Sequence, residues 1–285
     1  MFAARLRSGI PSIFSDWKMT IGLAVILALL LFGPVGARFV PEKGTRLGAA
    51  GFAEPPSAKN LLGTDTTGRD ILAMMVYGTP PTLLIGLLAG AVGTVVGVIL
   101  GLLSGYYRGP IDTVIRIAAD VALTIPALAV LVVLAAFLQT TTVSVMALIV
   151  ALFAWPWPTR TIRAQTLTLR EQGFVAMAQL SGRKDWQIIF LEILPNLLPY
   201  IMASFVGAVS GAILASVGLQ LLGLGPVLTP TIGLILQFSF EYAAIVRGMW
   251  WWWGPPTALL VVLFIGLFLV SMGLDEIANP RLKRA

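Results

Sequence analysis

Six stretches of this sequence are each long and apolar enough to cross a lipid bilayer, and no other feature restricts its fold as strongly. A membrane-spanning helix needs about 20 mostly apolar residues. The stretches that we predict as spans are residues 19–39, 82–105, 114–138, 143–161, 197–222 and 256–274. Because a bilayer cannot hydrate unpaired backbone groups, each span is expected to be helical. The sequence therefore predicts an all-α, polytopic membrane protein with six transmembrane helices.

The composition supports a membrane protein and excludes several kinds of active site. Of the 285 residues, 58% are hydrophobic and 11% are charged, whereas soluble domains are about a quarter charged. The chain has no cysteine and no histidine, which excludes disulfides, most zinc sites and a Ser-His-Asp nucleophile. No lysine follows a glycine, so a phosphate-binding loop is absent. We expect a non-catalytic protein with no cofactor and no metal site.

The distribution of lysine and arginine predicts the orientation in the membrane, because cytoplasmic loops carry an excess of these residues. A cytoplasmic N-terminus places thirteen of the 19 on the cytoplasmic side. These thirteen are Arg5, Arg7, Lys18, Arg108, Arg116, Arg160, Arg163, Arg170, Arg183, Lys184, Arg281, Lys283 and Arg284. The six on the other side are Arg38, Lys43, Arg46, Lys59, Arg69 and Arg247. The net charge of +6 then reflects topology beside anionic lipid headgroups, and does not indicate nucleic-acid binding.

This orientation divides the chain into regions. Residues 1–18 form a cytoplasmic N-terminus, and residues 19–39 form the first transmembrane helix. Residues 40–81 are extracytoplasmic. Residues 82–275 form a core of five transmembrane helices that contains a cytoplasmic loop, residues 167–195. Residues 276–285 form a cytoplasmic C-terminus.

One acidic residue, Asp120, lies clearly inside a predicted span. Arg116 precedes it by one helical turn, so the two side chains can form an ion pair on one face of the helix. A direct part in transport is the alternative, because intramembrane charges often mark transport pathways. Five further polar residues in the predicted spans are candidates for lining a pore: Ser104, Thr124, Ser204, Ser210 and Gln220.

Two glycine-containing motifs predict local structure. Gly93, Gly97, Gly101 and Gly105 repeat at every fourth position of the second span, which predicts close packing of another helix. In the polar motif GTDTTGRDIL, residues 63–72, Thr67 and Asp70 have the spacing of a helix-capping box. This motif predicts a short amphipathic helix that leads into the second span. Contact with an external partner is the alternative role.

The loop between the fourth and fifth spans has an amphipathic pattern but is too polar to cross a membrane. Its second half carries an apolar stripe at helical spacing: Trp186, Ile189, Phe190, Ile193 and Leu194. Gly182 is suited to end a preceding helix. We therefore predict two short helices joined at Gly182, the first exposing an aromatic side chain and the second lying against the bundle. They form either a docking element for another protein or a plain interfacial helix.

This loop resembles the EAA loop of binding-protein-dependent ABC importer permeases. Ala176, Met177 and Ala178 occupy the Glu-Ala-Ala positions, with Ala176 in place of the glutamate. Gly182 matches the motif glycine, and residues 193–196 match its Ile-Leu-Pro end. The segments LLGTDTTGRDIL, LQLLGLGP and LDEIANPRLKR resemble motifs of the C-type subunit of the dipeptide, oligopeptide and nickel permeases. Ser216 stands where an acid is common in that subfamily.

The resemblance implies the type I ABC importer permease fold and a set of partners. These are a homologous second permease, giving a heterodimer, two ABC ATPase subunits that hydrolyse the ATP, and an extracytoplasmic solute-binding protein. The implied ATPase-docking coupling helix consists of Phe174, Val175, Ala176, Met177, Ala178, Leu180, Gly182, Arg183, Lys184 and Asp185.

The expected cargo is a dipeptide or oligopeptide. Oligosaccharides are the alternative, supported by the four consecutive tryptophans at residues 250–253, which are otherwise expected to anchor the chain at a membrane interface. An ion-coupled carrier would need more buried carboxylates than this chain has. A membrane scaffold without an ATPase partner is the remaining alternative class.

Overall fold

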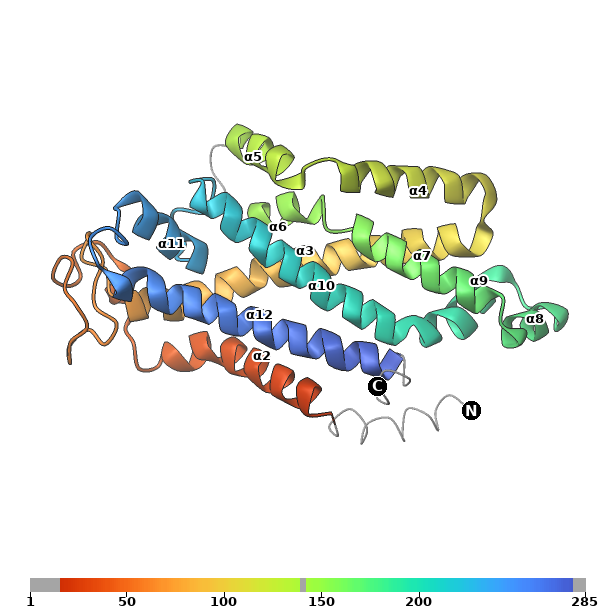
Figure 1. Cartoon of the computed structure of the whole chain (residues 1–285), viewed down its shortest axis with the longest axis horizontal. Helices are drawn as coiled ribbons and strands as arrows, with labels where there is room; N and C mark the ends of the chain where they lie inside the picture. The colour runs from red at the N-terminus through yellow and green to blue at the C-terminus, as the bar shows by residue number, and fades with distance from the viewer. Residues whose placement is uncertain (1–15, 139–141, 279–285) are drawn as a thin grey trace.

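The computed structural model describes residues 16–138 and 142–278, and within these ranges the chain is a bundle of helices (Figure 1). The β-type pairing within these ranges is an isolated antiparallel bridge between Thr64 and Asp70. The predicted terminal segments lie partly outside the described residues, so residues 1–15 and 279–285 are not considered further.

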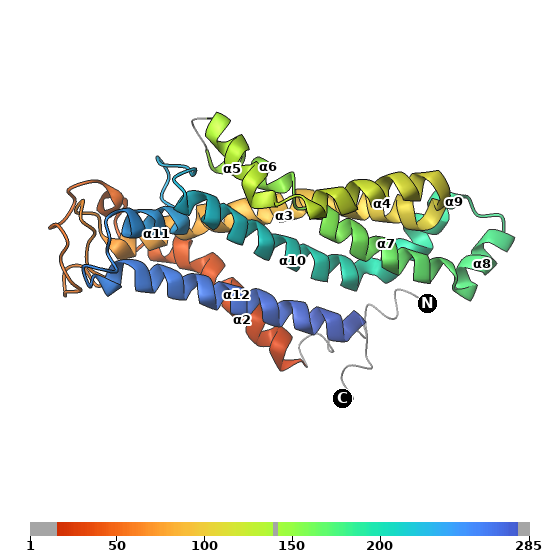
Figure 2. The ribbon, with the colours of Figure 1, turned by 45° about the horizontal axis from the view of Figure 1, so that its top comes forward.

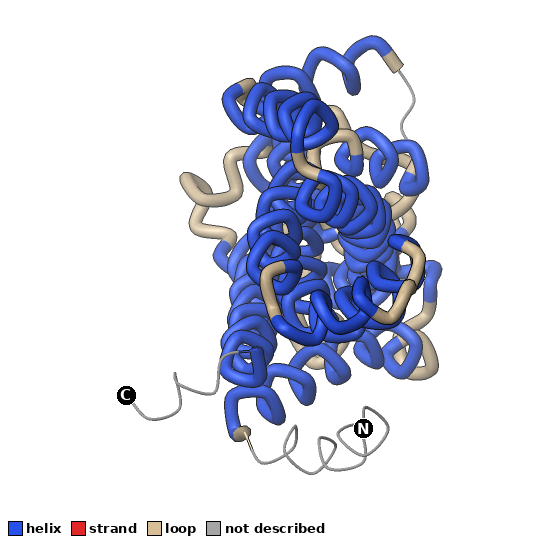
Figure 3. Tube along the Cα trace, turned by 90° about the vertical axis from the view of Figure 1, so that its right-hand side faces the viewer, coloured by secondary structure: helices blue, strands red, loops and turns tan. Residues whose placement is uncertain are grey.

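The helices run lengthwise through the molecule in both ribbon views (Figures 1 and 2). Their bounds are α2 (Trp17–Gly36), η1 (Glu42–Thr45), α3 (Ile71–Tyr107), α4 (Gly109–Thr124), α5 (Ala127–Phe137), α6 (Val143–Ala151), α7 (Pro156–Arg170), α8 (Gly173–Leu180), α9 (Asp185–Gln187), η2 (Ile188–Ile193), α10 (Leu194–Leu221), α11 (Ile232–Glu241) and α12 (Trp250–Ala278). Viewed from the end that carries α8, the long helices are seen almost along their axes (Figure 3).

The prediction of six apolar spans agrees with these helices. Four continuous helical segments are long and apolar enough to cross a membrane: α2, α3, residues 185–221 and the stretch of α12 up to Glu276. Two bent pairs bring the total of candidate spans in the described chain to six. In the first pair, α4 and α5 meet at 80°, and in the second, α6 and α7 meet at 46°. Pro126 precedes α5 and Pro156 begins α7, which explains both breaks because proline ends the preceding helix.

The second predicted span is part of a much longer helix. α3 begins at Ile71, where Asp70 accepts a hydrogen bond from the backbone N–H of Ala73 (2.9 Å). The helix predicted to lead into this span is therefore present, and it continues without a break into α3. The predicted Thr67–Asp70 capping box is wrong, because the Thr67 hydroxyl donates to Asp65 (2.7 Å) and Asp70 is itself the N-cap.

The glycine repeat of α3 allows the close approach that its spacing predicted. α7 packs along the second half of α3. A Cβ atom at Gly101 would lie 2.9 Å from the Thr159 carbonyl oxygen, and one at Gly97 would lie 2.9 Å from the Thr159 nitrogen. Only a residue without a side chain fits at this separation, so the glycines bring the two backbones together.

A compact cap closes the end of the bundle opposite α8. It contains residues 37–70, α11 and the start of α12 (Figure 1). The carboxylate of Asp65 accepts hydrogen bonds from the backbone N–H groups of Thr67 and Arg69, and pairs with the Arg69 side chain at 2.8 Å. The Arg69 guanidinium lies 4.5 Å from the centre of the Phe238 ring. The GTDTTGRD motif thus organises the cap and attaches it to α11.

Candidate functional site

The segment from α7 to α10 forms the end of the molecule opposite the cap. α8 projects at this end, beyond α7 and the turn between α3 and α4 (Figures 1 and 2). The chain leaves α7 at Arg170, forms α8 at Gly173–Leu180 and returns into the bundle from Asp185 onward. The predicted loop, residues 167–195, therefore presents one short helix outside the bundle.

Gly182 ends α8 as predicted. Its φ is +73°, in the left-handed region that favours glycine. The Gly182 N–H donates to the Gln179 carbonyl (3.0 Å), and the Arg183 N–H donates to the Ala178 carbonyl (3.2 Å). This pair of bonds is a Schellman motif, which satisfies the last carbonyl groups of the helix and turns the chain sharply.

One face of α8 attaches it to the bundle. Val175 is 0% exposed and Ala178 is 7% exposed. Both belong to an apolar cluster with Tyr106 of α3 and with Ile188 and Ile193 of η2. This cluster joins α8 to the end of α3 and to the start of the 185–221 helix.

The opposite face of α8 is apolar and open. Phe174, Met177 and Leu180 repeat at every third position and are 38%, 65% and 85% exposed. Ala176, at the position where the EAA motif has glutamate, is also exposed. A membrane-protein helix that protrudes from the bundle with three adjacent large apolar side chains has the features of a helix-in-groove ligand.

The prediction of a separate second helix is wrong, because residues 185–221 form one continuous helical segment. A π-helical turn, η2, inserts an extra residue into its first part. Ile189 and Ile193 of the predicted stripe are buried, at 6% and 0% exposed, whereas Trp186 and Phe190 are 56% exposed and Ile188, outside the stripe, is fully buried. A stripe counted at regular α-helical spacing cannot anticipate this shift in register.

Polar contacts hold the segment around α8 against the end of α3. The Tyr106 hydroxyl donates to Oδ1 of Asp185 (2.9 Å), and the Arg170 guanidinium lies 5.6 Å from the Tyr106 ring centre. Arg108, at the α3–α4 turn, pairs with Glu171 at 2.5 Å. Sequence reasoning missed Tyr106, Arg108 and Arg170, since their partners are far away in the chain and no spacing signal connects them.

The remaining predicted docking residues lie at the edge of α8. Arg183 forms an ion pair with Glu192 of η2. The backbone N–H of Lys184 donates to Oε1 of Gln187 (3.0 Å), which caps the start of α9. Of the ten predicted residues, Val175 and Ala178 pack against the bundle and the exposed Asp185 accepts a hydrogen bond from Tyr106. The open apolar face consists of Phe174, Met177 and Leu180.

The predicted ion pair between Arg116 and Asp120 is wrong. Asp120 pairs with Arg160 of α7 instead, at 3.7 Å. Arg163 of α7 binds both carboxylate oxygens of Asp112, at 2.5 and 2.8 Å. Arg116 forms no ion pair within the part of the chain that the structure describes. The acids of α4 therefore pair across to α7, because the glycine-lined contact with α3 also brings α7 close to α4.

The predicted pore-lining residues divide into two groups. Ser104 and Gln220 are 0% exposed and Ser204 is 5% exposed, so none of the three offers its side chain to an open surface of this chain. Ser104 donates to Asp112 (2.5 Å), and the Gln220 carbonyl oxygen accepts from the Thr231 hydroxyl. Thr124 is exposed and Ser210 half-buried, and these two remain candidates.

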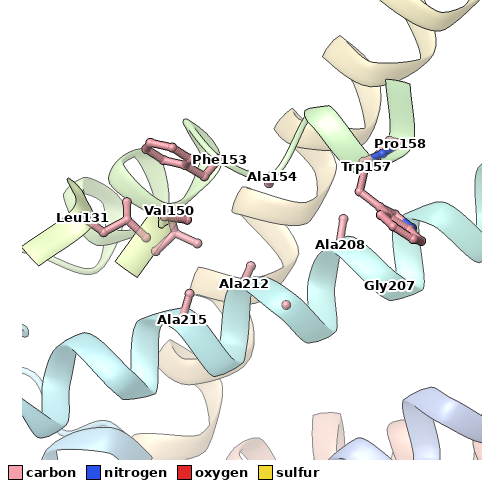
Figure 4. A pocket seen from close by; sticks show the side chains of 12 residues that line it. Leu131, Val150, Phe153, Ala154, Trp157, Pro158, Gly207, Ala208, Ala212 and Ala215 are labelled. Carbon is pink, nitrogen blue, oxygen red and sulfur yellow. The ribbon is translucent and has the colours of Figure 1, made fainter. Parts of the chain in front are cut away.

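An apolar groove of about 440 Å³ runs between α5–α7 and α10. Figure 4 shows small side chains of α10 on one side, and Leu131, Phe153 and Trp157 on the other. A Cβ atom at Gly207 or Gly211 would meet no atom within 4 Å. The groove is therefore open to a further helix or to lipid. Within residues 16–138 and 142–278, no group of three acidic side chains could hold a metal ion.

Comparison with known proteins places these features in one family. Residues 97–284 match the model of the family described as "Binding-protein-dependent transport system inner membrane component". The dipeptide transport system permease protein DppC of Alkalihalophilus pseudofirmus is 30% identical over 268 residues, 92% of this chain and 86% of the relative. The oligopeptide transport system permease protein OppC of Lactococcus lactis subsp. cremoris is 28% identical, over 81% of this chain and 78% of the relative.

A solved structure shares the fold. A chain from inward-facing conformations of the MetNI methionine ABC transporter aligns with a TM-score of 0.52 and 19% identity. The alignment covers 73% of this chain and 95% of that chain. The type I ABC importer permease fold implied by the EAA-like loop is thereby confirmed.

Proposed function

Since this chain belongs to the family of binding-protein-dependent transport system inner membrane components, we propose that it is a permease subunit of an ATP-driven importer of short peptides. The relatives described above are named for dipeptide and oligopeptide transport and match most of the chain, which supports peptides as cargo. The proposed location is the cytoplasmic membrane, with both termini and α8 on the cytoplasmic side, in agreement with the excess of lysine and arginine there.

The single observation that carries this proposal is the geometry of α8. Its open face of Phe174, Met177 and Leu180 would insert into a groove of an ABC ATPase subunit, while Val175 and Ala178 hold it to the bundle. This chain lacks a phosphate-binding loop, so ATP hydrolysis belongs to the two separate ATPase subunits. The chain itself is non-catalytic in this proposal.

Coupling follows from where α8 is attached. When the ATPases close on ATP, α8 moves with them and carries the ends of α3 and of the 185–221 helix. ATP can shift the permease between inward- and outward-facing states only if the docked states differ in their affinity for ATP. The Tyr106–Asp185 hydrogen bond and the apolar cluster at Val175 are the contacts that would transmit this difference.

A homologous second permease is the proposed partner within the membrane. The small side chains of α10 leave an apolar groove (Figure 4), and small residues allow transmembrane helices to approach closely. A heterodimer would cover this groove and enclose a transport path between the two permeases. An extracytoplasmic solute-binding protein would deliver cargo to the cap formed by residues 37–70 and α11.

Two of the four tryptophans that supported oligosaccharide transport make contacts within the protein, whereas Trp250 is 59% exposed. Trp252 is 1% exposed and stacks on Tyr242, with ring centres 6.0 Å apart. The Trp251 indole N–H donates to the Thr64 carbonyl (3.2 Å). These two tryptophans join the cap to α12, and do not form a stacking surface for sugars.

Uptake by the complete transporter tests the proposal. Liposomes containing the two permeases and the ATPases, with the binding protein outside, should take up a labelled short peptide when ATP is inside, and should not take up a labelled maltooligosaccharide.

Retention of the ATPases tests the docking face separately. The Met177→Asp variant should lose the ATPases during purification, because it places a charge on the apolar face of α8. Leu228→Asp, at a 96% exposed position in the loop before α11, is the matched control. Sugar uptake, or full ATPase retention by Met177→Asp, would contradict the proposal.

A further inference from the structure

Two neighbouring helices, α4 and α7, carry charged side chains that face each other. α4 bears Asp112, Arg116 and Asp120, and α7 bears Arg160 and Arg163 on the facing side. α4 and α7 are each one half of a bent candidate span. Charged side chains inside a membrane almost always face protein or a water-filled cavity.

The glycine contact of α3 gives the position of these charges along the bundle. Arg160 is adjacent to Thr159, whose nitrogen faces Gly97 and whose carbonyl oxygen faces Gly101. At 1.5 Å per residue, these glycines lie roughly 9–15 Å along α3 from Tyr107, at the helix end. Arg160 and Asp120 therefore lie in the half of the bundle that ends at α8, the side that the lysine and arginine distribution predicts to be cytoplasmic.

One of the ion pairs between α4 and α7 is saturated. The Arg163 guanidinium donates hydrogen bonds to both carboxylate oxygens of Asp112, and the Ser104 hydroxyl donates to the same carboxylate. The side chains of Arg163 and Asp112 are 24% and 17% exposed. This pair fastens α4 to α7 and has no capacity for another ligand.

The second pair is different. Arg160 and Asp120 are 3.7 Å apart, and their side chains are 58% and 50% exposed. Arg116, which is exposed, adds a second guanidinium without an ion-pair partner in the described chain. All three residues line a hollow of about 530 Å³, together with Trp157. Two guanidinium groups against one loosely held carboxylate leave an excess of positive charge and unused N–H donors.

We propose that this hollow lines the transport path and that Arg160, with Arg116, binds the C-terminal carboxylate of a peptide in transit. The planar donor fork of arginine fits a carboxylate in bidentate fashion, and every unmodified peptide carries such a group. The loose Asp120 contact keeps Arg160 oriented and is exchanged for the peptide carboxylate. This inference rests on the proposed peptide-import function.

A carboxylate could also come from an acidic side chain of the second permease. The two sources differ in one respect: only the peptide's carboxylate can be removed by amidating the peptide. A contact with the second permease would make the two permeases depend on Arg160 for their association, and would be indifferent to the C-terminus of the cargo.

The test compares a short peptide with its C-terminal amide in liposomes that contain the complete transporter. For each peptide, the ATP-dependent initial uptake rate of the Arg160→Gln transporter is divided by that of the unsubstituted transporter, so the preference of the binding protein cancels. The ratio for the free acid should fall roughly tenfold, the effect of losing one charge-assisted hydrogen bond. The ratio for the amide should stay near one.

Three further variants sharpen the result. Arg160→Lys keeps the charge but loses the fork, and should give an intermediate ratio for the free acid only. Arg116→Gln should act in the same direction as Arg160→Gln. Arg38→Gln, an exposed arginine just after α2, should change neither ratio.

Two outcomes would overturn the inference. Equal losses for the free acid and the amide would assign Arg160 a structural or hydration role. Loss of the second permease during purification of Arg160→Gln would assign the contact to a carboxylate of that subunit. An unsubstituted transporter that imports neither peptide would instead overturn the proposed function itself.

Discussion

The hydroxyl of Tyr106 donates a hydrogen bond to Oδ1 of Asp185 (2.9 Å), and this bond joins the end of α3 to the start of the 185–221 helical segment. The two residues are 79 positions apart in the chain. Between them runs the whole segment that contains α8. The bond therefore closes a loop whose outermost part is the proposed ATPase contact.

Replacing Tyr106 by phenylalanine should weaken coupling while keeping the fold. The variant loses a hydrogen bond worth about 1 kcal/mol but keeps the aromatic ring in its apolar cluster. Stimulation of ATP hydrolysis by the loaded binding protein should fall severalfold, with basal hydrolysis little changed. Asp185→Asn, which retains an acceptor oxygen, should have a smaller effect. Unchanged stimulation in Tyr106→Phe would show that this bond does not transmit the signal.

Gly182→Val should release the ATPase subunits. At a φ of +73°, a residue with a side chain costs about 1–2 kcal/mol relative to glycine. Valine is among the least tolerated residues at such a position. The end of α8 would then shift and misplace Phe174, Met177 and Leu180. We expect normal insertion in the membrane fraction and little co-purified ATPase. Gly182→Asn, which accepts the left-handed conformation more readily, should retain most of it. If both variants bound the ATPases equally well, the geometry of this turn would be irrelevant to docking.

Gly101→Val should destabilise the α3–α7 contact. A Cβ atom there would lie 2.9 Å from both the Thr159 carbonyl oxygen and the Ile162 side chain, and overpacking of this kind costs about 1–3 kcal/mol. The thermal midpoint of the detergent-solubilised complex should fall by several degrees. Gly254→Ala is a fitting comparison, because a Cβ atom at Gly254 of α12 meets nothing within 4 Å. Equal midpoints for Gly101→Val and the unsubstituted complex would mean that the helices are not closely packed.

Asp65→Asn should disrupt the cap. Asp65 is 2% and Arg69 8% exposed, and removing one partner of a buried pair costs about 3–5 kcal/mol, because the other charge is left uncompensated. The cap should become sensitive to limited proteolysis in residues 37–70. The double variant Asp65→Asn/Arg69→Met removes both charges and should recover part of the resistance. Equal resistance of the single variant and the unsubstituted chain would show that the pair is unimportant.

Much of this architecture follows from local sequence signals. Apolar length alone predicts the six spans. Gly182 shapes the chain within a few residues of itself, and the spacing of the α3 glycines marks a face for close packing whichever helix packs there, so both roles could be predicted. Other features depend on the tertiary fold. The π-turn at η2 shifts the register of a stripe that looked regular, and Asp120 pairs with Arg160 on another helix instead of with Arg116 one turn away. Tyr106 carries no signal for its bond to Asp185, because only the folded bundle brings the two together.

The central claim is that the apolar face of α8 docks onto an ABC ATPase, and photo-crosslinking tests it most directly. The chain has no cysteine, so Met177→Cys gives a single site for a benzophenone maleimide. Leu228→Cys gives a control site in the exposed loop between α10 and α11. In the complete transporter, with the partner subunits free of reactive cysteines, the label at residue 177 should crosslink to the ATPase subunits, and the label at residue 228 should not. Crosslinking of the ATPases from residue 228, or its absence from residue 177 in a transporter that still hydrolyses ATP, would contradict the account.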